Sequence, residues 1–319
     1  MIEFQDIIEF FIQAVELLKR GKIELCSPLE EIVLKSVADK LAYIDDRKMA
    51  LNCGFDVWRN IDKELLKERG ISKRVLYSRS NQFPDFIFKT RKANNRLICG
   101  SLLELKNSKG GYVASFNSTL PTKYKNLEEV DLVNGKRFVS KITSIFDGKL
   151  SKHEDYYKFP RRCFYLVRTY DCNPEKVKVS IVDGSFFETV PREYLIYQMF
   201  LQVLHEHIKK KKLEIPSEVL REVEDVLSHI TDQTIIAASR IIERASVRPR
   251  LRIMAEVHSE GNPHSSEHYP EISERSFNLI LKLTRETKKL ERKLLKRLPE
   301  LRAFTINHKR NGKYIVFQY

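Results

Sequence analysis

Apolar residues recur at helical spacing near the start of the chain. Residues 1–20 have one apolar side, which is formed by Ile7, Ile8, Phe11, Val15 and Leu18. A second helix is predicted over residues 28–43, because Ser27, Pro28 and Glu30 together form a helix-start signal. A third helix is predicted around residues 56–69, ending at Gly70.

The middle of the chain changes to short apolar segments that are bounded by turn residues. This pattern predicts strands over residues 83–88 (FPDFIF), 96–106 (RLICGSLLELK), 162–171 and 176–184. Polar turns separate the members of each pair, TRKANN in the first and Asn173-Pro174 in the second. An α/β core is therefore expected over residues 1–190.

The remainder, residues 191–319, is expected to be a mainly helical region that serves in DNA binding or dimerisation. Residues 192–245 have apolar positions at helical spacing, and residues 273–298 are predicted to form one long basic helix. Residues 258–272 read as a polar loop. The chain is expected to end in a β-hairpin that turns near Asn311-Gly312.

The charge of the chain indicates a polyanionic partner. The formal net charge is +14 and the isoelectric point is near 9.4, which favours nucleic acid, although a generically basic protein is the plainer alternative. No apolar run is long enough to span a membrane. The five scattered cysteines form no CxxC pair, which argues against a zinc ribbon or a disulfide framework and favours reduced thiols in the cytoplasm.

Candidate chemistry lies on the first two predicted strands. Side chains alternate faces along a strand, so Glu104 and Lys106 share one face while Leu103 and Leu105 share the other. Two charges on one face are explained either by a wet sheet edge or by an active site. In the second case Asp85 and Glu104 bind Mg²⁺, the Leu105 carbonyl is a further ligand, and Lys106 serves the attacking water.

Pro84-Asp85 and Glu104-Leu105-Lys106, separated by eighteen residues, resemble the paired motif of the PD-(D/E)xK nuclease superfamily. Within that superfamily the chain looks most like a type II restriction endonuclease. The resemblance implies a restriction-endonuclease-like α/β (α+β) core with a central mixed sheet flanked by helices. It also implies Mg²⁺-dependent cleavage of double-stranded DNA to 5′-phosphate ends, and a homodimer. It covers about 25 residues by motif and about 150 by core pattern.

Some members of this superfamily take a further acid from the upstream helix. Glu30 and Glu31 are the candidates here, and a plain solvated role is the alternative for both. Glu31 is also placed to pair with Lys35 one helical turn later.

Polar residues that follow the second strand are candidate DNA contacts. The alternative is an ordinary polar loop with turn residues. The candidates are Lys109, Ser115, Asn117, Ser118, Thr119, Thr122 and Lys123, joined by Arg161 and Arg162 before the third strand.

The resulting prediction is a type II site-specific deoxyribonuclease. A repair or junction-resolving nuclease with the same core is the second possibility, and a non-catalytic DNA-binding protein with a decayed nuclease fold is the third. The loop that holds His258, His264 and His268 is expected to be a flexible polar loop rather than a metal site.

Overall fold

The computed structural model describes a defined subset of the chain. These residues are 4–37, 75–77, 83–89, 99–113, 115–117, 120–126, 128–130, 160–171, 173, 175–230 and 254–319. The helix predicted around residues 56–69 lies outside them, as does the polar turn between the first two predicted strands.

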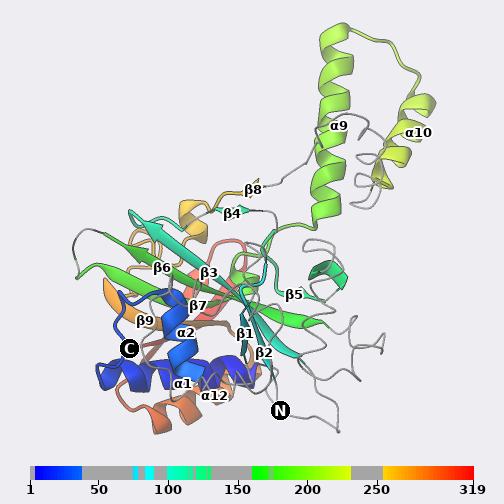
Figure 1. Cartoon of the computed structure of the whole chain (residues 1–319). Helices are drawn as coiled ribbons and strands as arrows, with labels where there is room; N and C mark the ends of the chain where they lie inside the picture. The colour runs from blue at the N-terminus through cyan, green and yellow to red at the C-terminus, as the bar shows by residue number, and fades with distance from the viewer. Residues whose placement is uncertain are drawn as a thin grey trace, which may run out of the picture. The chain divides into compact units, whose positions relative to one another are not determined.

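A mixed β-sheet forms the centre of the fold (Figure 1). Within the described residues it has nine strands, and eight of them follow the order β1-β2-β3-β6-β7-β9-β11-β10, while β5 pairs with β6. Two of the pairings, β3 with β6 and β7 with β9, are parallel, and the other pairings are antiparallel. The strands are β1 Val75–Tyr77, β2 Phe86–Lys89, β3 Cys99–Lys109, β5 Tyr124–Lys125, β6 Arg161–Tyr170, β7 Val177–Asp183, β9 Arg275–Lys282, β10 Arg302–His308 and β11 Gly312–Gln318.

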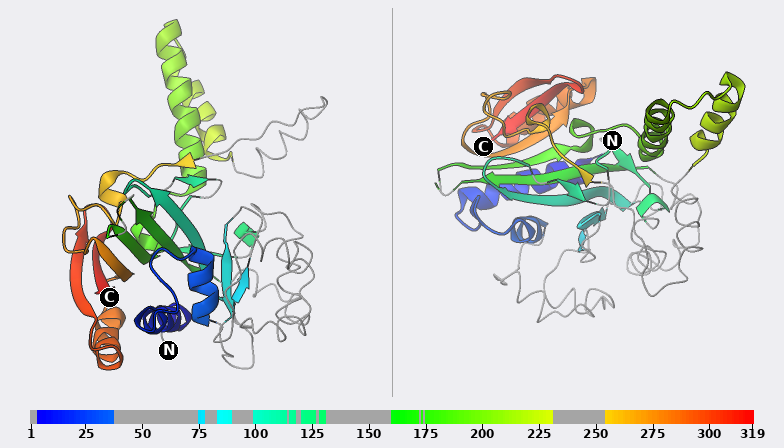
Figure 2. Two further views of the ribbon diagram at one scale, coloured as in Figure 1. Left: turned by 60° about the vertical axis from the view of Figure 1, so that its left-hand side comes forward. Right: turned by 90° about the horizontal axis from the view of Figure 1, so that it is seen from above.

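One face of the sheet is covered by helices. The helices α1 (Gln5–Lys19), α2 (Leu29–Val37) and α12 (Arg285–Arg297) all contribute to one apolar cluster with this face. Both views of Figure 2 place α1 and α2 on the same side of the sheet. This arrangement confirms the expectation of a mixed α/β architecture with flanking helices.

The opposite face carries a second apolar cluster, which includes residues from short segments of the chain. Leu102, Tyr165 and Val182 of the sheet pack there with residues from shorter segments. The segments are β4 (Phe116–Asn117), η2 (Gly184–Phe186) and the stretch around Tyr269 and Ile272. Because the side chains of each strand alternate, every central strand supplies both clusters and is buried on both faces.

The chain divides into two compact units. Residues Thr189–Met254 form the smaller unit, which contains α9 (Arg192–Lys211) and α10 (Ser217–Ser228). Met1–Glu188 and Ala255–Tyr319 together form the larger unit. The first boundary falls near the expected residue 190, but the expected division differs at the C-terminal end, because β9, β10 and β11 return to the central sheet.

The prediction of one long helix over residues 273–298 was wrong. The structure has β9 followed by α12, and Thr284 and Thr287 form a capping box that starts the helix at Arg285. The segment FNLIL is apolar enough to suit a strand or a buried helix. Pairing of β9 with both β7 and β11 stabilises the extended form.

The other predicted elements that the structure describes are confirmed. α1 and α2 begin close to their predicted starts, and β2, β3, β6 and β7 correspond to the four predicted strands. The terminal hairpin is formed by β10 and β11. Two short elements complete the order, β8 (Met254–Ala255) and η3 (Ser259–Gly261). Among the described helices, none combines the length and the apolar character that a membrane crossing requires.

Candidate active site

Asp85 and Glu104 lie opposite one another on neighbouring segments of the sheet. Phe86 of β2 is paired with Leu103 of β3 in an antiparallel register, so the next positions outward are Asp85 and Glu104. The Asp85 carboxylate accepts a hydrogen bond of 2.8 Å from the backbone N–H of Leu105. This bond holds the Asp85 carboxylate beside β3, as the hairpin expectation requires.

The expected alternation of side chains along β3 is confirmed. Leu102 belongs to the second apolar cluster, and Glu104 and Lys106 follow it at two-residue steps on the same face. Leu103 and Leu105 pack against the helix-covered cluster instead. A wet sheet edge does not explain the charges, because β3 lies between β2 and β6 and the side chains of Glu104 and Lys106 are only 12% and 13% exposed.

Lys106 is held within this site by two contacts. Its Nζ atom lies 3.1 Å from Glu104 Oε1, at hydrogen-bonding distance. The same ammonium group lies 5.2 Å from the centre of the Phe116 ring. The three residues of the predicted constellation therefore come together in the structure, each from a strand or strand end of the central sheet.

Burial raises the pKa values of both carboxyl groups, and like charge adds to the rise for Asp85. Burial raises the pKa of Asp85 to about 8, and the charge of Glu104 adds to the effect. Burial also raises the pKa of Glu104, while the charges of Lys106 and Lys125 oppose that rise. A nearby cation would relieve the repulsion between the two carboxylates.

One oxygen of Glu104 is poorly satisfied. Oε2 is buried and has no hydrogen-bond partner within the described part of the chain. A buried carboxylate oxygen without a partner is costly, so this oxygen suits an additional positive ligand. This donor set of two carboxylates fits Mg²⁺, which proteins commonly bind through one or two carboxylates while it keeps several waters.

The upstream acids Glu30 and Glu31 have different surroundings. The Glu31 carboxylate forms an ion pair of 2.5 Å with Lys35, one turn later in α2. The charge of Glu30 contributes to the raised pKa of Asp85, so Glu30 is the acid whose charge acts on the site. The predicted pairing of Glu31 with Lys35 is thus confirmed, and the two adjacent acids have different surroundings.

Arg168 of β6 positions the start of α2 against the sheet. Its guanidinium donates to the backbone carbonyl of Leu25 at 3.3 Å, and to the Asn107 side chain on β3 at 2.9 Å. Burial lowers the pKa of Arg168, and the charge of Glu30 partly offsets this effect. The segment that leads into α2 is therefore tied to the strand that carries the site.

Sequence reasoning missed two residues that support the site. Lys125 of β5 acts on Glu104 through its charge, and its Nζ lies 5.2 Å from the centre of the Phe83 ring. The buried Asp6 carboxylate of α1 accepts from both the N–H (2.7 Å) and the hydroxyl (2.9 Å) of Ser101, near the start of β3. Both contacts join segments that are far apart in sequence, so no local sequence pattern predicts them.

The structure corrects two of the candidate DNA contacts. Arg161 and Arg162 are 1% and 8% exposed, and Arg162 forms an ion pair with the buried Asp183. These arginines belong to the interior of the fold rather than to a phosphate-binding surface. Register explains this, because β6 runs through the centre of the sheet and β5 pairs against this end of it.

The remaining contact candidates have mixed outcomes. Lys109 is exposed at the end of β3, while Ser115, Thr122 and Lys123 are partly buried in the segment that follows. The backbone N–H of Thr122 donates to the hydroxyl of Tyr165 at 3.3 Å. Ser118, Thr119 and the side chain of Asn117 lie outside the described residues.

The loop that holds His258, His264 and His268 contacts the central sheet through His264. The buried His264 ring is held between the hydroxyls of Thr169 (2.8 Å) and Ser180 (2.7 Å). His268 contacts Ser259 at 3.2 Å. Of the residues that the structure describes, no three His, Cys, Asp or Glu side chains are grouped to share a metal ion.

Comparisons with protein-family models, curated proteins and solved structures give no significant match. The geometry of the site is therefore the basis for its proposed function.

Proposed function

We propose that the protein is a Mg²⁺-dependent endonuclease that cleaves double-stranded DNA, in the manner of a type II restriction enzyme. The observation that carries the proposal is the opposed pair of buried carboxylates, Asp85 and Glu104, with Lys106 on the same face of β3. The net charge of +14 supports a polyanionic substrate.

In the proposed site Asp85 and Glu104 hold the metal ion. The partnerless Oε2 of Glu104 and the repulsion between the two carboxylates both favour a divalent cation there. When bound, Mg²⁺ supplies positive charge to the scissile phosphate and makes a water molecule more acidic. The Leu105 carbonyl, whose residue is already fixed through its N–H, remains a proposed additional ligand.

In this proposal Lys106 is the catalytic side chain that the protein itself supplies. Its ammonium group is held between Glu104 and the Phe116 ring, where it can orient the attacking water and stabilise developing negative charge on the phosphate. Attack of water on phosphorus with loss of the 3′ oxygen leaves a 5′-phosphate and a 3′-hydroxyl. Glu30 adds negative charge near Asp85 and strengthens the attraction for the ion.

Two further features of the proposal follow from the chemistry. One such site hydrolyses one strand, so cleavage of both strands at a defined position calls for two sites, and we propose a homodimer. We expect the enzyme to act in the cytoplasm. Lys109, Ser115, Thr122 and Lys123 remain proposed DNA contacts.

Incubation of the purified protein with plasmid DNA and Mg²⁺ tests the proposal. We expect discrete fragments with 5′-phosphate ends, and we expect them to disappear in EDTA and in a Glu104→Gln variant. This substitution keeps the size of the side chain and removes its charge. Circular dichroism and unfolding curves should show that the variant is folded.

Parallel incubations with linear duplex and four-way branched DNA define the substrate. Cleavage of branched DNA alone would replace the restriction-type proposal by junction resolution. Absence of cleavage on every substrate by folded, Mg²⁺-supplied protein would contradict nuclease activity altogether.

A further inference from the structure

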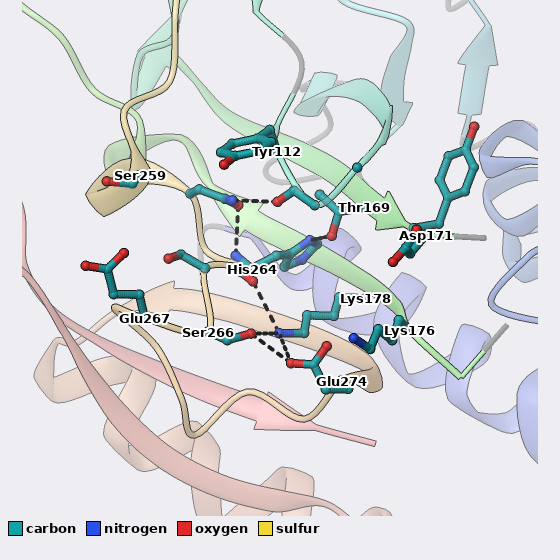
Figure 3. A pocket seen from close by; sticks show the side chains of 15 residues that line it. Tyr112, Thr169, Asp171, Lys176, Lys178, Ser259, His264, Ser266, Glu267 and Glu274 are labelled. Atoms are coloured by element: carbon teal, nitrogen blue, oxygen red, sulfur yellow. Dashed lines mark hydrogen bonds and ion pairs between the residues drawn. The ribbon is translucent and has the colours of Figure 1, made fainter. Parts of the chain in front are cut away.

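A polar pocket that is separate from the proposed active site lies in the larger unit, at the end of β3. It has a volume of about 350 Å³, near the lower limit of typical ligand pockets. Figure 3 shows Tyr112 and Ser259 on one side of this pocket, and Lys178 with Glu274 on the other. The walls come from the loop after β3, from β6 and β7, and from the stretch between η3 and β9.

Hydrogen bonds hold the pocket walls in place. The Asn262 side chain donates to the carbonyl of Gly111 at 2.8 Å and accepts from the N–H of His264 at 3.0 Å. Lys178 contacts Ser266 at 3.0 Å and Glu274 at 3.1 Å, as the dashed lines in Figure 3 indicate. The cavity is therefore preformed, so a ligand would not need to order its walls.

The character of the pocket favours a flat, neutral ligand with polar edges. Tyr112 is 72% exposed and lines the pocket, so an aromatic ring is presented to solvent. The ionisable lining has two lysines and three carboxylates, which does not suit a bare phosphate; these are Lys176, Lys178, Asp171, Glu267 and Glu274. Nucleobases combine a π-face, on which aromatic residues stack, with hydrogen-bonding edges that meet both donors and acceptors.

Two adjacent glycines leave the backbone open at this point. Gly110 and Gly111 both have positive φ values, +89° and +78°, and a Cβ atom added to either would meet nothing within 4 Å. The absence of side chains lets a ligand come close to the backbone beside Tyr112. The loop is also fixed at its first residue, because the Gly110 N–H donates to the carbonyl of Tyr170 at 2.9 Å.

The pocket lies just beyond the end of β3, on the face of the sheet that carries the proposed active site. Ser108 of β3 is paired with Thr169 of β6, and both positions alternate in phase with Glu104 and Lys106. Gly110 follows Lys106 by four residues, a distance of about 13 Å along a strand. That spacing equals about four steps of B-form DNA.

We infer that this pocket is a subsite for one unstacked nucleobase of DNA, with Tyr112 as its stacking platform. The inference rests on the proposed nuclease function, since it places the base just beyond the end of the strand that carries Glu104 and Lys106. The preformed cavity, which has charged groups of both signs in its lining, receives the base, and the exposed ring covers one of its faces. The sugar-phosphate backbone stays outside the pocket.

Binding without cleavage tests the subsite. Fluorescence anisotropy in EDTA compares a labelled single-stranded oligonucleotide with an abasic oligonucleotide of equal length, which keeps the phosphates and lacks the bases. We expect wild-type protein to bind the base-bearing strand more tightly. Tyr112→Ala should weaken binding of that strand about tenfold and leave binding of the abasic strand unchanged.

Two matched variants complete this test. Tyr112→Phe keeps the ring and should bind as wild type does, whereas Tyr194→Ala removes another exposed tyrosine, on α9, and should have no effect. Unchanged binding by Tyr112→Ala would overturn the inference, and so would equal losses on both strands. Cleavage of DNA without base-dependent binding would support the proposed nuclease function and contradict the subsite. Base-dependent binding without cleavage would support the subsite and contradict the nuclease function.

Discussion

The Asp85 carboxylate is fixed beside Glu104 by a backbone hydrogen bond from Leu105, the next residue of the chain after Glu104. The antiparallel register places Asp85 and Glu104 opposite one another, and burial leaves both carboxyl groups with raised pKa values. Such an arrangement is unfavourable for folding by itself. A bound cation would offset this cost, and destabilising arrangements of this kind are common at functional sites.

Asp85→Asn should stabilise the metal-free protein. The amide keeps an acceptor for the Leu105 N–H and removes one of two repelling buried charges, so we expect a gain on the order of 2 kcal/mol in EDTA at pH 8.5. The gain should shrink as pH falls below 8, because Asp85 then takes up a proton in the folded protein. Urea unfolding of both proteins at pH 8.5 and at a pH below 8 measures this difference in stability.

The same variant should lose its response to Mg²⁺. A ligand that binds only the folded state raises the melting temperature, so Mg²⁺ should stabilise the wild type and leave Asp85→Asn unchanged. Glu193→Gln, which removes an exposed charge on α9, serves as the control and should respond as the wild type does. An equal Mg²⁺ shift in the wild type and in Asp85→Asn would place the ion elsewhere.

Lys106→Ala should separate cleavage from binding. Removal of an ammonium group that serves the attacking water is expected to lower the cleavage rate roughly 10²- to 10⁴-fold. Binding of duplex DNA in EDTA should change less than tenfold, because one charge among many is lost. Single-turnover cleavage and anisotropy measure the two effects, and parallel losses of both would assign Lys106 to binding alone.

Glu30→Gln and Glu31→Gln form a matched pair on adjacent residues. Loss of the Glu30 charge should raise the Mg²⁺ concentration needed for half-maximal cleavage severalfold, because this charge acts on Asp85. Glu31→Gln should leave that concentration unchanged. It breaks the ion pair with Lys35 and should lower the free energy of unfolding by about 0.5 kcal/mol. Equal Mg²⁺ curves for the two variants would contradict the distinction.

His264 should make the fold sensitive to acid. Burial lowers the pKa of its imidazole to about 3, and the charge of Lys178 adds to the effect, so the ring is neutral in the folded protein. Between its ordinary value of 6.5 and 3, the unfolded chain binds a proton that the folded protein does not. Stability therefore falls as the pH falls through this range.

His264→Gln removes that sensitivity. The wild type is expected to be more stable than this variant at pH 7.5, since the ring bonds both Thr169 and Ser180. The difference in unfolding free energy should shrink by about 2 kcal/mol at pH 5.0, at 1.36 kcal/mol for each pH unit below 6.5. His205→Gln replaces an exposed histidine as the control. A constant difference across this range would show that His264 is not kept neutral by the fold.

The sequence by itself determined the local elements and the composition of the site. Periodicity located α1, α2, β2, β3, β6 and β7, because each has an apolar pattern of one clear period. Alternation along β3 was enough to put Glu104 and Lys106 on one face. The polar turn between the two apolar segments predicts a hairpin that brings Asp85 beside Glu104 and Lys106.

Only the tertiary structure decided what required contacts between distant segments. β9 is a strand because β7 and β11 flank it, although its apolar run suits either period. Arg161 and Arg162 are interior residues because β6 crosses the centre of the sheet, and Glu30 differs from Glu31 through its place near Asp85. The effect of the Lys125 charge on Glu104 and the pocket beside Tyr112 likewise depend on contacts between distant segments. A residue's charge and period are local properties, whereas its burial and its neighbours depend on which strands pair, and that choice is made by the whole chain.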